Sequence, residues 1–197
     1  MPIKDLPKMK RMTKHPRHSR AKPASEQKLW ATAYHEAGHV VAALAYGKGI
    51  RRQGATIIPD AEALGTVHTL KHIPGDPSVD LLTGRMRLRI EEDVIVSLAG
   101  GAAQRKFRPS SVRSHHVRRD QVAADRLLDY ITVSERERHA YWRWLMVRAE
   151  DFVDDSFRWM QIEAVAKALM EKKTLGPKEL KKVYVDALGG PIGVKGS

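Results

Sequence analysis

The feature that most constrains this chain is an H-E-A-G-H run, His35 to His39, at the centre of an apolar stretch. Ser25 is a favourable N-cap and Gly47 a common helix stop, so the stretch predicts a helix over about 26–46. Apolar or small side chains surround most of its circumference, which is typical of a buried helix. Two histidines and a glutamate are costly to bury there unless they are paired or bind a metal.

The spacing of this motif brings both imidazoles to one face of the helix. Residues i and i+4 lie one above the other, so His35 and His39 can reach the same metal ion. Glu36 follows the first histidine and can lean over the open side of the metal, where it would take a proton from a bound water. The pattern therefore predicts a Zn²⁺ hydrolase site with His35 and His39 as ligands and Glu36 as the catalytic base.

A catalytic zinc also needs a third protein ligand and an open fourth position. The chain contains no cysteine, so disulfides are excluded and the ligand must be His, Asp or Glu. One extended form of the motif places a glycine and a third histidine where this chain has Ala42 and Ala45. The remaining candidates lie elsewhere in the sequence: Asp60, Glu62, Glu91, Glu92, Asp93, His115, His116, Asp120 and Asp125.

The rest of the chain predicts a small sheet followed by several helices. Strands are expected at 54–59 and 64–70, with a loop at 71–80. Helices are expected from Asp80 or Thr83 to about 107 and over about 119–130, 135–154, 156–172 and 177–188, with a polar loop at 109–117 and Thr174 as the last cap. The expected fold class is α+β and mostly helical: the zinc-site helix lies beside a small sheet or hairpin, and a helical bundle follows. Gly100 and Gly101 are interpreted as a close helix contact.

The formal net charge of +12 is concentrated at the N-terminus. Residues 1–24 carry eight Lys or Arg against one Asp, with four prolines, and are expected to form a disordered basic arm. A domain that carries the zinc site, at 25–188, and a flexible glycine-rich tail at 189–197 would follow. The arm could contact nucleic acid, acidic lipid headgroups or an acidic partner, although it has no aromatic side chain to stack on bases. A solubilising tail without a specific partner is the alternative.

The sequence favours a cytoplasmic protein. No apolar run approaches the length that spans a bilayer, so no transmembrane segment is expected. The positive N-terminus is not followed by the apolar core of a secretory signal. The absence of cysteine fits a reducing compartment.

Five short motifs follow one another between about residues 27 and 188. They are A-Y-H-E-A-G-H-V-V-A at 33–42, the strand pair at 56–59 and 63–70, L-A-G-G-A-A-Q at 98–104, R-D-Q-V-A-A-D at 119–125 and T-L-G-P-K-E-L at 174–180. In this order they resemble the zinc peptidase domain of the FtsH-type (AAA) proteases. The resemblance implies that Asp120 is the third zinc ligand. A carboxylate at a helix N-terminus would be stabilised by the helix dipole, and a plain N-terminal acid is the alternative.

The strand at 64–70 would then be an exposed edge beside the zinc site. A polypeptide substrate could add to it through backbone hydrogen bonds, with Gly65, Thr66, Val67 and His68 as its contacts. The family's peptidase domains form rings, so this chain could also be an oligomer.

The chain departs from the family at several positions. Gln104 stands where a glutamate is usual, and the loop at 110–116 adds His115 and His116 as further candidate ligands or substrate contacts. The printed sequence contains no G-x-x-x-x-G-K-[ST] phosphate loop, so neither the family's ATPase module nor its membrane anchor is expected. We therefore expect a stand-alone, ATP-independent zinc endopeptidase acting on unfolded or flexible polypeptides. The alternatives are a catalytically inactive binding module tethered by its basic arm, or a regulatory protease that cleaves a repressor of a mobile element.

Overall fold

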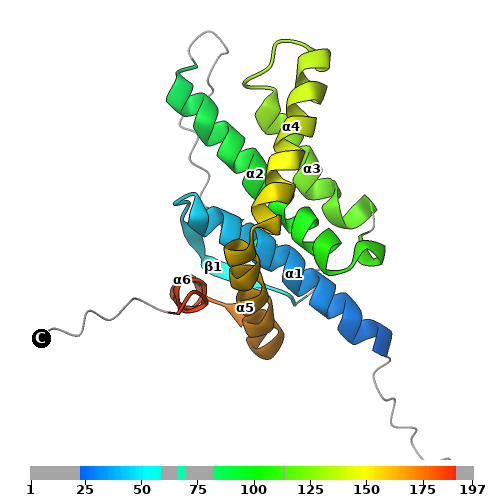
Figure 1. Cartoon of the computed structure of the whole chain (residues 1–197), viewed down its shortest axis with the longest axis vertical. Helices are drawn as coiled ribbons and strands as arrows, with labels where there is room; N and C mark the ends of the chain where they lie inside the picture. Colours follow the sequence, from blue (N-terminus) through cyan, green and yellow to red (C-terminus); the bar gives the residue numbers. More distant parts are fainter. Residues whose placement is uncertain (1–22, 59–65, 70–81, 113, 190–197) are drawn as a thin grey trace, which may run out of the picture.

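The computed structural model describes residues 23–58, 66–69, 82–112 and 114–189 (Figure 1). The elements in chain order are α1 (Pro23–Ala45), β1 (Ile50–Thr56), β2 (Thr66–Thr69), α2 (Gly84–Phe107), the 3-10 turn η2 (Pro109–Ser111), α3 (Ser114–Leu128), α4 (Glu135–Asp154), α5 (Ser156–Lys172), β3 (Thr174–Leu175) and α6 (Pro177–Asp186). Helices dominate and a small antiparallel sheet accompanies them, which confirms the mostly helical α+β class. Of the predicted arm, only 23–24 are described, in the first turn of α1; the rest of the arm and residues 190–197 lie outside the described part.

Local sequence signals place the ends of α2, α4 and α5, whereas the prediction of Ser25 as the N-cap of the motif helix is wrong because α1 begins at Pro23. Helices α4 and α5 have the predicted bounds, and α2 ends at Phe107 as predicted. At the start of α2, the hydroxyl of Thr83 accepts a hydrogen bond from the Met86 amide at 3.2 Å. At the start of α4, Ser134 accepts from the Glu137 amide at 3.1 Å. These caps satisfy amides that have no partner within the helix, and they explain why the boundaries can be read from sequence.

The sheet has the strand order β2-β1-β3 and is antiparallel throughout. The prediction for β1 is wrong at its start, because Ile50–Thr56 begins four residues before the predicted strand. Residues 51–53 are exposed and two are arginines, so they lack the apolar alternation of a half-buried strand. Gly54 has a φ of +69°, and a Cβ there would lie 1.9 Å from the Leu175 carbonyl oxygen. Glycine therefore permits the close approach of β1 to β3.

The prediction that Thr174 caps the last helix is wrong. Thr174 lies in β3, where it pairs with Thr56 of β1. The N-cap of α6 is Gly176, whose amide donates to the Glu179 carboxylate at 3.0 Å. A two-residue strand is too short to show a pattern of alternating side chains. It forms because its backbone pairs with β1, and the local sequence does not reveal that pairing.

Helix α1 occupies the centre of the molecule, between α2 on one side and α5 with β1 on the other (Figure 1). One core cluster joins Val40 and Val41 of α1 to the apolar face of α5. A second cluster joins α2 to α3 and α4. At Gly38, an added Cβ would lie 2.5 Å from the Ala99 carbonyl oxygen, so this glycine permits the close contact of α1 and α2. The predicted buried motif helix is therefore confirmed.

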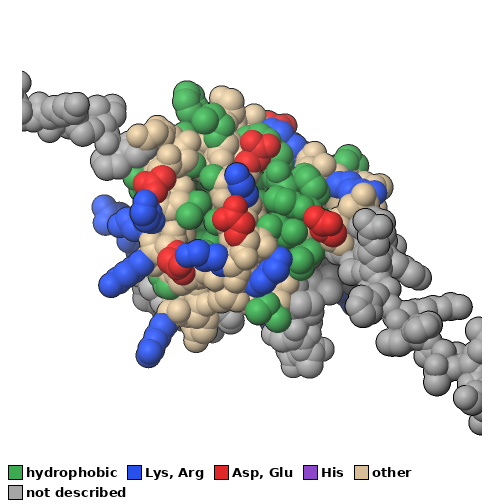
Figure 2. Space-filling model, turned by 90° about the horizontal axis from the view of Figure 1, so that it is seen from below, with side chains coloured by type: hydrophobic (Ala, Val, Ile, Leu, Met, Phe, Trp, Pro, Cys, Tyr) green, Lys and Arg blue, Asp and Glu red, His purple; other side chains and the backbone are tan. Residues whose placement is uncertain are grey.

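The described surface carries charges of both signs, unlike the strongly basic N-terminal residues. Residues 1–24 hold seven of the twelve net positive charges. On the face that α5 and α6 present, acidic side chains lie among the lysines and arginines, with hydrophobic side chains between them (Figure 2). The described domain is thus much less basic than the whole chain.

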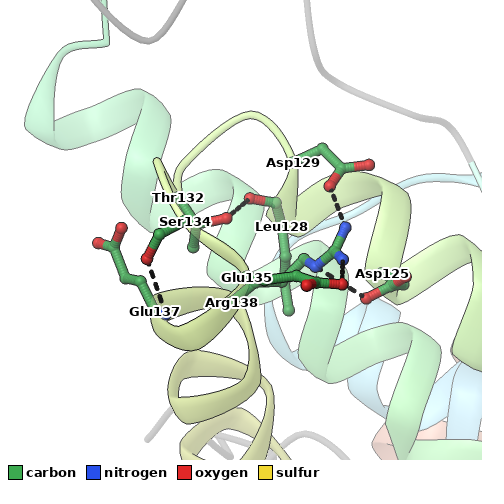
Figure 3. A network of polar contacts seen from close by, with 8 residues as sticks. All are labelled: Asp125, Leu128, Asp129, Thr132, Ser134, Glu135, Glu137 and Arg138. Atoms are coloured by element: carbon green, nitrogen blue, oxygen red, sulfur yellow. Dashed lines mark hydrogen bonds and ion pairs between the residues drawn. The ribbon is translucent and has the colours of Figure 1, made fainter.

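The end of α3 is tied to the start of α4 by a cluster of charges (Figure 3). Arg138 of α4 donates from Nη1 to Oδ1 of Asp129 at 2.7 Å. Its Nε lies 3.7 Å from Asp125 of α3, and its Nη2 lies 3.5 Å from Glu135. This cluster fixes the turn that follows α3.

Replacing Arg138 with methionine should lower the thermal unfolding midpoint slightly, by no more than about 2–4 °C, because partly exposed ion pairs contribute little. High salt should reduce the difference from wild type, since it screens these pairs. Arg136→Met, on the same helix turn but outside the charge cluster, is the control. Equal midpoints for the two variants would show that the cluster does not stabilise the fold.

Candidate metal centre

Three candidate ligands from two helices meet at one point. His35 and His39 extend from α1 one turn apart, and their Nε2 atoms are 3.1 Å from each other. Asp120 reaches them from α3, with Oδ2 3.0 Å from Nε2 of His35 and 3.4 Å from Nε2 of His39. The group has the composition and spacing to hold a metal ion. The tertiary structure thus brings together the residues that the motif and the family resemblance point to.

The hydrogen bonds behind the two rings favour a cation between them. Nδ1 of His39 lies 2.8 Å from the carbonyl oxygen of Val96, which can only accept, so Nδ1 carries a proton. Nδ1 of His35 lies 3.0 Å from Oε1 of Gln104. The lone pairs of both Nε2 atoms then face Oδ2 of Asp120. Three atoms with lone pairs repel one another at 3.0–3.4 Å unless a proton or a metal ion lies between them. Outer hydrogen bonds of this kind orient histidine ligands in metal sites.

The charges of the site shift the pKa values of its members in opposite directions. Burial alone lowers the pKa of His39, but the charge of Asp120 and its hydrogen bond outweigh burial and raise this pKa to about 9. Burial alone raises the pKa of Asp120, but His39 and His35 together hold it well below its usual range. In the absence of a metal charge, the site is therefore an imidazolium–carboxylate pair near neutral pH.

Binding of a divalent metal ion to this group near neutral pH should release about one proton per ion, because His39 must lose its proton to coordinate the metal. Asp120 is already ionised and contributes none. Since the metal competes with a proton that is bound below a pKa of about 9, the apparent affinity should fall about tenfold per pH unit of acidification. Calorimetric titration with zinc in buffers of different ionisation enthalpy measures the protons released. An affinity that does not change with pH would contradict this assignment.

Glu36 lies beside the candidate ligands in the buried part of α1, and it is 4% exposed. Burial raises the pKa of its carboxyl group, the two histidines oppose this rise, and Asp120 adds to it. A carboxylate with a raised pKa can accept a proton from water and later return it near neutral pH. The arrangement therefore places a candidate general base next to the group of ligands.

Gly100 leaves the space that the His39 ring fills. A Cβ at Gly100 would lie 2.3 Å from Nε2 of His39, which is too close for any side chain. The prediction of a close helix contact is confirmed for Gly100, and its partner across the α1–α2 interface is the ring of a candidate ligand. A close contact with a helix backbone occurs at Gly38. Sequence reasoning missed this role because it depends on which ring faces the glycine across the α1–α2 interface.

Asp120 is not at a helix N-terminus, so the predicted stabilisation by the helix dipole is wrong. Helix α3 begins at Ser114, which puts Asp120 in its second turn. The predicted polar loop is replaced by η2 and the first turn of α3. Ser114 to His116 carry no apolar side chain, so the amphipathic pattern does not mark this first turn. The two histidines that face Asp120, rather than the helix end, stabilise its charge.

The other candidate ligands have other partners or lie outside the described residues. Glu91 accepts a hydrogen bond from Tyr141 at 2.5 Å. Lys48 pairs with Glu92 at 3.1 Å and Asp93 at 2.9 Å. Asp125 belongs to the Arg138 cluster. Asp60 and Glu62 are not among the described residues, and neither are the side chains of His115 and His116.

The predicted substrate contacts lie at the edge of the described sheet. Thr66, Val67 and His68 belong to β2, the outer strand in the order β2-β1-β3, and β2 contacts α1. Gly65 and the predicted loop at 71–80 fall outside the described residues. The backbone of β2 is therefore positioned beside the helix that carries the motif.

Comparisons with known proteins do not identify this chain. It matches no protein-family model and no curated protein. Within the described part of the chain, every helix is too short or too polar to cross a membrane.

Proposed function

We propose that this chain is a zinc-dependent endopeptidase of the FtsH type that cleaves unfolded or flexible polypeptides without ATP. The observation that supports this most is the convergence of His35, His39 and Asp120 next to the buried carboxyl group of Glu36. In such an enzyme His35, His39 and Asp120 would hold the metal, and Glu36 would transfer the proton.

The chemistry of the three candidate ligands favours zinc. Two imidazole nitrogens and one carboxylate oxygen are a common set for catalytic zinc, and three protein ligands leave a fourth position open. When bound there, zinc would polarise a substrate carbonyl and lower the pKa of a coordinated water. The Glu36 carboxylate would accept the proton from the attacking water and donate it to the leaving amine. Burial of Glu36 supports this role, because it raises the pKa toward the working pH.

The position of β2 supports a polypeptide as the substrate. An outer strand exposes backbone amides and carbonyls to which an extended chain can hydrogen-bond. Only a segment without its own secondary structure can pair in this way. We therefore propose unfolded chains, flexible tails and peptides as substrates, bound along Thr66–Thr69.

The experiment combines metal analysis with a cleavage assay on one preparation. Wild-type protein purified with zinc should contain one ion per chain and cleave a fluorescently labelled unfolded protein in a buffer without nucleotide. A chelator should stop cleavage, and added zinc should restore it. Asp120→Asn should lose zinc and activity, whereas Asp125→Asn, five residues further along α3, should keep both.

The outcomes also distinguish the alternative functions. Protein that stays metal-free in excess zinc would contradict the proposal and favour a catalytically inactive binding module. Protein that binds zinc but cleaves no unfolded chain would contradict the proposed substrate class, and a folded regulator would become the candidate.

A further inference from the structure

Gln104 is a buried amide on α2 that contacts the candidate metal centre from behind. It is 2% exposed, and its Oε1 lies 3.0 Å from Nδ1 of His35. At the other end of the amide, Nε2 lies 3.1 Å from the carbonyl oxygen of Ser111 and 3.4 Å from its hydroxyl. One side chain therefore connects a candidate ligand on α1 to the turn η2 that precedes α3.

The contacts of this amide fix the direction of both hydrogen bonds. The backbone carbonyl of Ser111 can only accept, so the NH₂ group of Gln104 must face it. Oε1 consequently faces His35, where it can only accept, and this places a proton on Nδ1 of the ring. The Nε2 atom of His35 is thereby held toward Asp120 and His39.

A carboxylate at position 104 would reproduce only half of this arrangement. An ionised glutamate could accept from Nδ1 of His35, but it has no proton to donate to Ser111. Its second oxygen would face the Ser111 carbonyl oxygen, and a partly buried carbonyl that faces a carboxylate instead of a donor is costly. The Ser111 hydroxyl donates to the Arg108 carbonyl at 2.7 Å, which keeps the turn closed. The contact with η2 therefore requires the amide.

We infer that Gln104 is a positioning residue for metal binding, whose amide orients the His35 ring and ties it to the turn at Ser111. This inference rests on the proposed metal centre. The other ring, His39, is oriented by the backbone carbonyl of Val96, which side-chain substitutions leave in place. Loss of the Gln104 amide should therefore release one ligand of the pair and leave the other held.

The test replaces Gln104 with methionine, which has a similar length but makes neither hydrogen bond. Zinc affinity, measured by competition with a chromophoric chelator, should fall about 10–100-fold. The visible absorption of the Co²⁺-substituted protein should also change, because it reports the ligand geometry. Gln104→Glu restores an acceptor for Nδ1 and should recover most of the affinity. Its unfolding midpoint should stay below that of wild type, because the donor to Ser111 is lost.

Gln161 on α5 provides a matched control. It is a buried amide, 1% exposed, whose Nε2 donates to the Tyr184 carbonyl at 3.1 Å and whose Oε1 accepts from Arg158 at 3.2 Å. Gln161→Met should reduce stability without changing zinc affinity. Wild-type affinity in Gln104→Met, or an equal loss of affinity in both methionine variants, would overturn the inference. If Gln104→Met does not fold, a large loss of affinity in Gln104→Glu would overturn it.

A measurement without metal separates this inference from the proposed function. In chelator-treated protein labelled with ¹⁵N-histidine, NMR should show an Nδ1 proton on His35 that exchanges slowly with solvent. The same proton should exchange rapidly in Gln104→Met. If the wild-type protein bound no zinc, the proposed enzymatic function would be contradicted. The two exchange rates would still test whether Gln104 orients the His35 ring. Equal exchange rates in the two proteins would overturn the inference.

Discussion

Replacing Glu36 with glutamine should leave zinc bound and reduce cleavage of an unfolded polypeptide by about 10²–10⁴-fold, the usual contribution of a general base. The amide has nearly the same shape as the carboxylate but cannot accept the proton of the attacking water. Glu36 is buried in α1 beside the two histidines, so the change removes a charge without opening the site to solvent. The effect should appear in kcat more than in KM, because the proton moves only in the chemical step.

The measurement needs both metal content and cleavage rate on the same sample. Glu171→Gln is the control, since Glu171 is exposed on α5 and the substitution removes the same charge away from the site. Wild-type activity in Glu36→Gln would rule out Glu36 as the base. Loss of zinc from this variant would instead show that Glu36 contributes to metal binding.

Replacing Gly100 with alanine should weaken zinc binding about 10–100-fold and lower activity by a factor of about 10² or more, because a ligand ring is displaced. The added methyl carbon would lie 2.3 Å from Nε2 of His39 and 2.6 Å from Cε1. Neither atom can stay in place, since contacts this short do not occur between non-bonded atoms. The ring is also held from behind by the Val96 carbonyl, so it cannot move away freely.

Two other glycines separate this effect from a general loss of stability. Gly84 lies on the same helix, and no atom lies within 4 Å of the carbon that Gly84→Ala would add. This variant should match wild type in zinc affinity and in unfolding midpoint. Gly38→Ala would clash with the Ala99 carbonyl oxygen at 2.5 Å, so it should lower the unfolding midpoint by separating α1 from α2. Zinc affinity and unfolding midpoint should be measured for all three variants. Wild-type zinc affinity in Gly100→Ala would contradict the close contact with His39.

Local patterns predicted much of the helical architecture. Helices α4 and α5 could be predicted at both ends, because each has an apolar stripe and a polar residue that caps its first turn. The existence of the motif helix could also be predicted, since His35 and His39 are four residues apart and Ala37 and Gly38 leave room for a neighbour. Its start could not, because α1 begins at Pro23. These features depend on residues within one or two helical turns of each other.

Contacts between distant segments could not be predicted in this way. The strand β3 exists only because β1 lies beside it, and the exposed arginines of β1 conceal the start of that strand. The first turn of α3 is polar, so its beginning at Ser114 is not visible as a periodic pattern. In the sheet a neighbouring strand, rather than the local sequence, stabilises the backbone conformation.

The sequence by itself determined that two histidines share one helical face with a glutamate next to the first, because helix geometry alone sets that relation. Only the tertiary structure decided which further groups face them. Asp120 approaches from α3, Gln104 supports His35 from α2, and Gly100 opens the space for His39. These contacts join segments up to 85 residues apart in the chain. They form because α1 and α3 both pack against α2, which brings the segments together, and no local preference of the residues specifies them.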